Sequence, residues 1–180
     1  MVCLPTIMEK KVTSHTTKGL VIALILIVLG LIANFGGFEY AAWYRYLPTL
    51  ILVVAVIWAC INYANQMGNA VTFGNVFAHG FKTSAVVTIL MLVFALVSIY
   101  LIFPDSKEKA IEMARQEMEK NPRLSESDVD AAVDMTRKFF LVGVIGGTIL
   151  FTLITGLIAS LLGAAFAKKT PPSPFNNPNP

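Results

Sequence analysis

Six polar side chains lie around the junction of two long apolar runs, and their residue types can bind a ligand or an ion. They are Asn62, Asn65, Gln66, Asn75, His79 and Lys82. Amide, imidazole and ammonium groups supply hydrogen bonds and positive charge, so one interpretation is a polar pocket at the mouth of a helical bundle. The other interpretation is structural. The segment is then a half-helix at the membrane edge, because Phe73, Phe77 and Phe81 recur every four residues on one helical face, where they can contact lipid or neighbouring helices. We favour the membrane edge and keep a ligand site and a partner contact as alternatives.

Other patterns that carry chemistry are missing from the sequence. It contains no H-E-x-x-H, no G-x-S-x-G and no P-loop. Its cysteines, Cys3 and Cys60, do not have the spacing of metal ligands, and Cys60 lies inside an apolar run, where cysteine is usually a small packing residue. We therefore expect no catalytic residue, no metal and no cofactor, and we do not expect an enzyme.

The composition is typical of a chain that sits in a lipid bilayer. Its 180 residues are 56% hydrophobic and 14% charged, and the mean hydropathy is +0.68. Nine of the 11 acidic residues and seven of the 14 basic ones fall between Asp105 and Lys138. The net charge of +3 comes without a basic stripe, so we expect the bilayer and not a nucleic acid as partner.

Four segments are long and apolar enough to cross a hydrocarbon core of about 30 Å, which takes about 20 helical residues. They cover residues 18–35, 47–66, 81–103 and 139–167. None contains an acidic residue, and the lysines lie at their ends, as expected where an ionised group at the bilayer centre is costly. The sequence therefore predicts an all-α integral membrane protein whose four-helix transmembrane domain covers residues 18–167.

Residues 105–138 differ in kind, because they are polar and predict a helical hairpin outside the bilayer between the third and fourth transmembrane helices. Apolar residues from Ile111 onward share one helical face, until Pro122 interrupts the helix. Ser125 and Asp128 have the spacing of a capping box, which predicts a second helix that runs into the last span.

Both ends of the chain are predicted to lie outside the helices. Residues 1–17 form an N-terminal segment in which Met8 resembles a natural start, so residues 1–7 are interpreted as an upstream extension. Residues 168–180 are rich in proline and asparagine, and we expect a disordered tail there.

The last predicted span carries small residues at intervals of about one helical turn. They are Gly143, Gly147, Thr148, Thr152, Gly156, Ser160 and Ala164. Small side chains let helix backbones approach closely, which is a main source of helix association in lipid. We expect this face to be buried, and we favour contact within the chain's own bundle over contact with a second copy.

The basic residues beside the spans indicate an orientation. Two lysines precede the first span, Lys18 begins it and two lysines follow the last span, whereas Arg45 alone lies in the first connection. Because lysine and arginine favour the cytoplasmic side, both termini are predicted to be cytoplasmic. The hairpin at residues 105–138 then lies on the opposite side of the membrane.

Several segments together resemble one family of bacterial membrane proteins. They are VTFGNVFAHGFKTSA before the third span, IFPDSKEKAIEMARQEMEK after it, LSESDVDAAVDMTRKFF, and the glycine-rich last span that ends in AAFAKK. Over residues 8–169 the chain resembles the family of domain of unknown function 4199 (DUF4199), which has four spans and is found mainly in Bacteroidota. The resemblance implies a four-span architecture in a bacterial inner membrane, and it implies no activity, cofactor or catalytic residue.

Three classes of function fit these features. The first is a non-enzymatic accessory or scaffold component that binds a membrane-protein partner through the hairpin or through the small-residue face of the last helix. The second is a small pore or transporter built as a homo-oligomer, and the third is an intramembrane enzyme. We favour the first, because the spans lack the acidic residues that ion-coupled transport usually requires.

Overall fold

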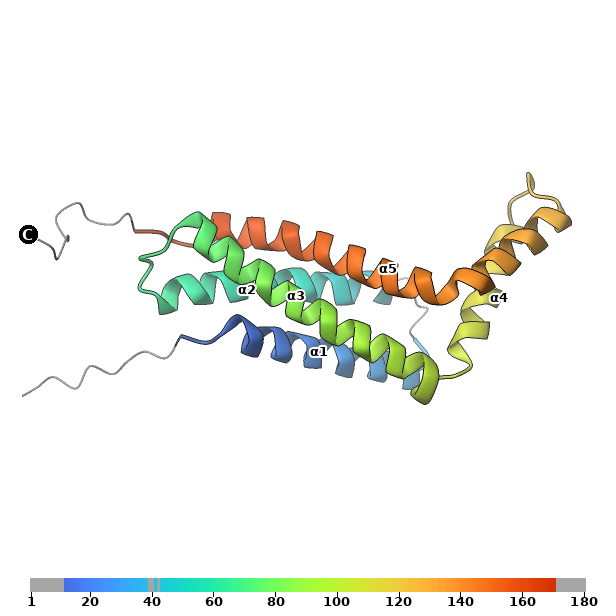
Figure 1. Cartoon of the computed structure of the whole chain (residues 1–180), viewed down its shortest axis with the longest axis horizontal. Helices are drawn as coiled ribbons and strands as arrows, with labels where there is room; N and C mark the ends of the chain where they lie inside the picture. The colour runs from blue at the N-terminus through green and yellow to red at the C-terminus, as the bar shows by residue number, and fades with distance from the viewer. Residues whose placement is uncertain (1–11, 39–40, 42, 171–180) are drawn as a thin grey trace, which may run out of the picture. The chain divides into compact units, whose positions relative to one another are not determined.

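The computed structural model describes residues 12–38, 41 and 43–170, which fold mostly into helices (Figure 1). The helices are α1 (His15–Phe35), η1 (Tyr44–Tyr46), α2 (Leu47–Gln66), α3 (Phe73–Val97), η2 (Ser98–Ile102), α4 (Ser106–Glu119) and α5 (Glu126–Phe166). No strand occurs among the described residues, and the all-α prediction is confirmed. The predicted extension at residues 1–7 and the tail at residues 171–180 lie outside the described residues.

Four of the described helical segments are long and apolar enough to cross a membrane, and the prediction of a multi-pass membrane protein is confirmed. They are His15–Phe35, Tyr44–Gln66, Phe73–Ile102 and Glu126–Phe166. The third and fourth begin before the apolar runs at residues 81 and 139, because a helix continues through polar residues as long as its backbone hydrogen bonds are made. At 1.5 Å per residue the 41 residues of α5 extend about 62 Å, roughly twice the hydrocarbon thickness.

Local signals set where the helices begin. The Ser14 hydroxyl caps α1 by accepting a hydrogen bond of 3.1 Å from the N–H of Thr17. The Thr72 hydroxyl accepts a hydrogen bond of 3.3 Å from the N–H of Asn75 and caps α3 in the same way. Pro48 lies in the first turn of α2, where the N–H that proline lacks would have no helical partner.

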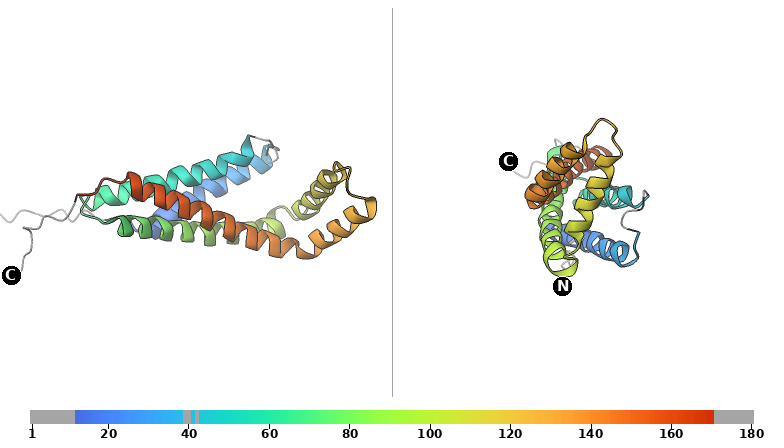
Figure 2. Two further views of the ribbon diagram at one scale, coloured as in Figure 1. Left: turned by 90° about the horizontal axis from the view of Figure 1, so that it is seen from above. Right: turned by 90° about the vertical axis from the view of Figure 1, so that its right-hand side faces the viewer.

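The chain divides into two compact units. The first comprises Met1–Val87 and Leu153–Pro180, and the second comprises Thr88–Thr152. α3 and α5 therefore each contribute one part to each unit. In the first unit α1, α2, the beginning of α3 and the end of α5 pack along one another (Figures 1 and 2).

Small residues allow the helices of the first unit to approach closely. A Cβ atom at Gly80 of α3 would collide with the Cys60 side chain of α2 and would lie 3.1 Å from the Ser160 Cβ of α5. A Cβ at Gly163 of α5 would lie 2.7 Å from the Cys60 Cβ. Such close packing holds helices together in lipid, where the hydrophobic driving force between them is missing.

In the second unit α4 and the beginning of α5 form a helical hairpin, drawn in yellow and orange in Figure 2. Its small core contains Ile111, Val129 and Val133, which are each less than a tenth exposed, and Met118 and Phe140 pack against them. A buried apolar cluster thus forms between α4 and the beginning of α5, within the polar stretch of the sequence. The position of this hairpin outside the bilayer stays a prediction.

Polar contacts fix the register of the hairpin. Arg115 of α4 donates a hydrogen bond of 2.8 Å to the Asp130 carboxylate of α5. The pair is exposed and screened by water, so it orients the two helices more than it stabilises them. The predicted capping box is present: the Ser125 N–H donates to the Asp128 carboxylate at 3.1 Å, and the Asp128 N–H donates to the Ser125 hydroxyl at 3.3 Å.

Candidate functional site

The beginning of α3 carries three of the six polar residues that the sequence singled out. Asn75, His79 and Lys82 share one helical face and line a cavity of about 360 Å³. The opposite wall is formed by residues 13–15, at the start of α1, and by Tyr63 near the end of α2. The tertiary structure therefore joins these three residues to a segment that the sequence did not connect with them.

The other three predicted residues lie elsewhere. Gln66 is paired with Thr13: its side-chain oxygen accepts a hydrogen bond of 3.0 Å from the Thr13 N–H, and its amide group donates one of 3.0 Å to the Thr13 hydroxyl. Asn62 lines a separate groove, and Asn65 is exposed. Gln66 thus holds the segment before α1 against the end of α2.

His79 is the most enclosed polar side chain of the cavity, with 8% of its surface exposed. Its ring stacks on Tyr63 with 4.1 Å between ring centroids and meets the edge of His15 at 6.1 Å. The Nε2 atom of His79 is buried and has no hydrogen-bond partner among the described residues. Because buried polar atoms are nearly always paired, this nitrogen has an unused capacity for a hydrogen bond.

Lys18 is a buried cation that the sequence analysis placed only at the end of a span. The residue is 3% exposed, and its Nζ donates a hydrogen bond of 3.2 Å to the carbonyl oxygen of Ala59. The same Nζ lies 6.0 Å from the centroid of the Tyr63 ring. Helical periodicity could have revealed this burial, because Lys18 precedes the buried Ile22 and Leu26 by one and two turns.

Positive charge in the first unit has no acidic counterpart among the described residues of that unit. Lys18, Lys82 and His15 all lie within electrostatic range of His79. At the same end of the bundle, the Lys169 Nζ lies 5.2 Å from the centroid of the Phe73 ring. This end therefore combines basic groups with aromatic rings, as is typical of the level of lipid headgroups.

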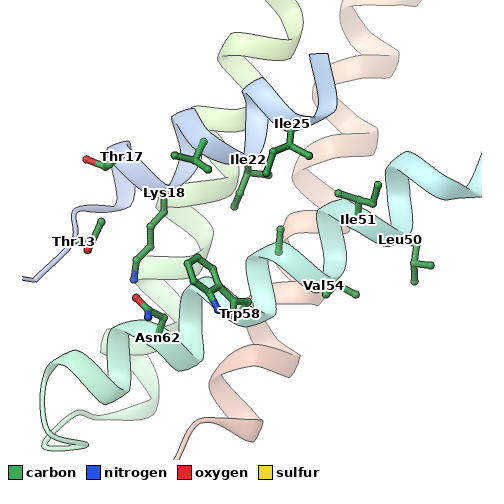
Figure 3. Close-up of a pocket in the computed structure, with 12 residues that line it drawn as sticks. Thr13, Thr17, Lys18, Ile22, Ile25, Leu50, Ile51, Val54, Trp58 and Asn62 are labelled. Carbon is green, nitrogen blue, oxygen red and sulfur yellow. The ribbon is translucent and has the colours of Figure 1, made fainter. Parts of the chain in front are cut away.

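An apolar groove of about 590 Å³ runs between α1 and α2 (Figure 3). Aliphatic side chains such as Ile25 and Val54 line most of its length, and Lys18 and Asn62 lie at one end. In Figure 3 the Lys18 side chain extends from α1 toward α2. The groove shares Thr13 with the polar cavity.

The small residues toward the end of α5 are enclosed within the protein. Thr152, Gly156, Ser160 and Ala164 are all buried. A Cβ atom at Gly156 would collide with Ser84 of α3, and the Ser160 hydroxyl donates a hydrogen bond of 2.6 Å to the Gly156 carbonyl oxygen. These residues pack α5 against its own chain.

The small residues earlier in α5 have different surroundings. Gly143 and Gly147 are exposed, and a Cβ atom at either would meet no described atom within 4 Å. Thr148 is half-buried. Met135 and Phe139 line, together with Gly143, a groove of about 650 Å³ on this side of the helix. The set that the sequence presented as one face thus has an enclosed part and an open part.

Comparison with protein families matches residues 17–169 to the family described as protein of unknown function (DUF4199). The chain belongs to the DUF4199 family. This match confirms the resemblance drawn from the sequence motifs. Neither the curated proteins nor the solved structures contain a match to this chain.

The DUF4199 match includes both candidate surfaces of the chain. It covers His79 and Lys82 at the polar cavity and Gly143 and Gly147 on the open part of α5, whereas residues 13–15 precede it. Within the described ranges, no group of three or more histidine, cysteine, aspartate or glutamate side chains could hold a metal ion. The geometry therefore offers a helix-packing surface and a basic polar cavity as starting points for a function.

Proposed function

We propose that this DUF4199 protein is a non-enzymatic accessory component of the membrane that docks a transmembrane helix of a partner protein. The docking face is the open part of α5 from Met135 to Gly147. One observation carries the proposal: a Cβ atom at Gly143 or Gly147 would meet no described atom within 4 Å, although the later small residues of the same helix are packed.

The spacing of the two glycines supports helix docking. Gly143 and Gly147 are four residues apart and form a G-x-x-x-G pattern on one side of α5. In lipid, such a pair lets a second helix approach until the two backbones are in contact, and dispersion and weak hydrogen bonds then hold the helices together. The adjoining groove of about 650 Å³ gives large side chains of the incoming helix a place to pack.

The surroundings define the chemistry of the partner. Phe139 and Phe140 line the groove, so the incoming helix is apolar at this level and carries small residues opposite Gly143 and Gly147. The hairpin at residues 105–138 has nine acidic and seven basic residues, so the segment that follows the partner's helix is expected to be basic. Two copies in the same orientation would instead bring two acidic hairpins together.

The proposed location is a bacterial inner membrane, with both termini in the cytoplasm and the hairpin on the other side. The excess of lysines beside the chain ends supports this orientation. A pore lined by the small-residue face of α5 is disfavoured, because Gly156, Ser160 and Ala164 are buried within the chain.

Site-specific photocrosslinking in native membranes tests the docking face. A photoreactive amino acid at Val144, which lines the groove, is expected to crosslink to a different membrane protein. Gly147→Leu fills the open space and is expected to lower the crosslink yield by roughly tenfold or more, because two backbones can no longer approach closely. Gly146→Leu is the matched control, since a Cβ atom there also meets no described atom within 4 Å, and Gly146 lies on the side of α5 opposite to Val144, which lines the groove.

The partner must then satisfy a reciprocal test. Replacing the small residues in the crosslinked segment of the partner by leucine is expected to abolish the crosslink as Gly147→Leu does. A ladder composed only of copies of this chain would replace the proposal by a homo-oligomer. A crosslink that is equally strong in the Gly146→Leu and Gly147→Leu variants would refute the docking face.

A further inference from the structure

The polar groups that line the cavity beside the start of α1 are all basic or neutral. Its polar lining includes Ser14, His15, Asn75, His79 and Lys82. Among the described residues of the first unit none is acidic, so none of them neutralises this charge. A cavity with this balance of charge favours an anion.

His79 supplies an independent sign of a missing partner. Its imidazole is held in place by the stack on Tyr63 at 4.1 Å and by the edge contact with His15 at 6.1 Å. The ring lines the cavity with 8% of the residue exposed, and the buried Nε2 is unpaired among the described residues. A positioned ring with an unused nitrogen is suited to a hydrogen bond with a ligand.

The first turn of α1 strengthens the preference for an anion. α1 has 21 residues and begins at His15, which lines the cavity. The free N–H groups at the start of a helix and the helix dipole place partial positive charge there. Oxygen-rich anions of tetrahedral shape, above all phosphate, are commonly bound at such positions.

We propose that this cavity binds a phosphate group. Lys82 supplies the full positive charge, and His79 and His15 supply hydrogen bonds to the phosphate oxygens. The phosphodiester of a lipid headgroup and free inorganic phosphate share this chemistry. For a lipid, the apolar groove between α1 and α2, which shares Thr13 with the cavity, would accept an acyl chain. The site lies in the first unit and is independent of the docking face on the second.

The test uses the full chain in a mild detergent and three probes. Dihexanoyl phosphatidylglycerol and inorganic phosphate carry the phosphate group, and dihexanoylglycerol carries the same acyl chains without it. Histidine-selective nitrogen NMR reports binding directly, because the chain has 2 histidines and His15→Phe assigns the remaining signal. The Nε2 resonance of His79 is expected to shift with at least one phosphate probe and to stay in place with dihexanoylglycerol.

Two variants measure the contribution of the cavity. Lys82→Met and His79→Phe are each expected to weaken phosphate binding by roughly tenfold, as for the loss of one charge-assisted hydrogen bond. His79→Phe keeps a ring to stack on Tyr63. Lys82 is exposed, so Lys82→Met leaves the packing intact and decides the question even if the histidine variant does not fold. Lys120→Met, at an exposed lysine of the hairpin, is the matched control and is expected to bind like the wild type.

Each outcome has a defined meaning. A response to phosphatidylglycerol alone assigns a lipid headgroup, a response to inorganic phosphate alone assigns a free anion, and a response to both assigns a phosphate site open to either source. The proposal is overturned if neither phosphate probe moves the His79 resonance, if dihexanoylglycerol gives the same shift, or if Lys82→Met binds as tightly as Lys120→Met.

Discussion

Glycine has two different roles along α5, and each role follows from what surrounds the missing side chain. At Gly163 a Cβ atom would lie 2.7 Å from the Cys60 Cβ and 3.1 Å from the backbone of Ile57. At Gly147 the corresponding space is open. The first glycine is therefore required by the packing of this chain, whereas no described atom fills the space beside the second.

Valine at the two positions should separate these roles. Gly163→Val is expected to destabilise the protein by about 1–3 kcal/mol, because overpacking forces α2 and α5 apart. Gly147→Val is expected to change the free energy of unfolding by less than about 0.5 kcal/mol. Unfolding in mixed detergent micelles, followed by circular dichroism, measures both. Equal destabilisation by the two variants would mean that Gly147 is packed within the chain.

Lys18 and His79 show how a membrane helix can hold polar groups near its end. The Lys18 Nζ donates a hydrogen bond to the carbonyl oxygen of Ala59 and lies near the face of the Tyr63 ring. The His79 ring stacks on the same Tyr63 ring. The Tyr63 ring thus contacts both the ammonium group of Lys18 and the imidazole of His79. Their burial without an acidic counterpart among the described residues of the unit is the physical reason for expecting an anion.

At the scale of elements, α5, like α3, belongs to both units of the chain. Its beginning is polar and pairs with α4, its middle carries the open glycines, and its end is enclosed by α2 and α3. The long helix starts at a capping box, in which Ser125 and Asp128 exchange hydrogen bonds of 3.1 Å and 3.3 Å. The start of α5 is therefore fixed locally and needs no contact from the first unit.

Removal of the cap should loosen only the first turn of α5. Ser125→Ala is expected to cost about 1 kcal/mol locally, because the helix loses the hydroxyl that accepts its early N–H group. Hydrogen exchange at the amides of Asp128 and Val129 is expected to quicken by roughly fivefold, with little change beyond Phe139. Ser127→Ala serves as the control, because it removes only a hydroxyl contact of 2.9 Å with Ser125 and leaves the three hydrogen bonds between Ser125 and Asp128 in place. Identical exchange in the two variants would argue against the cap.

At the scale of the whole molecule, a chain that crosses the membrane at all four candidate spans is expected to have its two ends on the same side. The hairpin follows the third candidate span, so we expect it on the side opposite the ends. Its charged residues favour water, because transfer of ionised groups into hydrocarbon is costly. The proposed sidedness, with the ends in the cytoplasm, is open to a direct test.

Cysteine labelling in intact cells tests this topology. In a Cys3→Ser background, where the remaining Cys60 is buried, Lys120→Cys is expected to react with a membrane-impermeant maleimide. Thr170→Cys is expected to react only after the cells are permeabilised. The reverse pattern would invert the orientation, and labelling of both sites in intact cells would contradict the four-span arrangement.

The sequence by itself determined the features that depend on local chemistry. Hydropathy over about 20 residues identified the four spans, and the polar hairpin and the capping box at Ser125 followed from periodicity and side-chain type. These features are predictable because hydrocarbon matching and helix capping involve residues that are close in the chain. Hydropathy alone placed the spans from residues 81 and 139, whereas α3 and α5 begin earlier, at Phe73 and Glu126, because polar residues continue a helix beyond its apolar run.

Only the tertiary structure decided which of these residues meet. It grouped His15 and Tyr63 with His79, buried Lys18 against Ala59, and divided the small residues of α5 into an enclosed part and an open part. Each of these outcomes depends on the distance between helices that are far apart in the sequence, and residue types alone do not encode that distance. Whether a glycine is needed for packing or is available to a partner depends on whether a neighbouring helix already fills the space beside it.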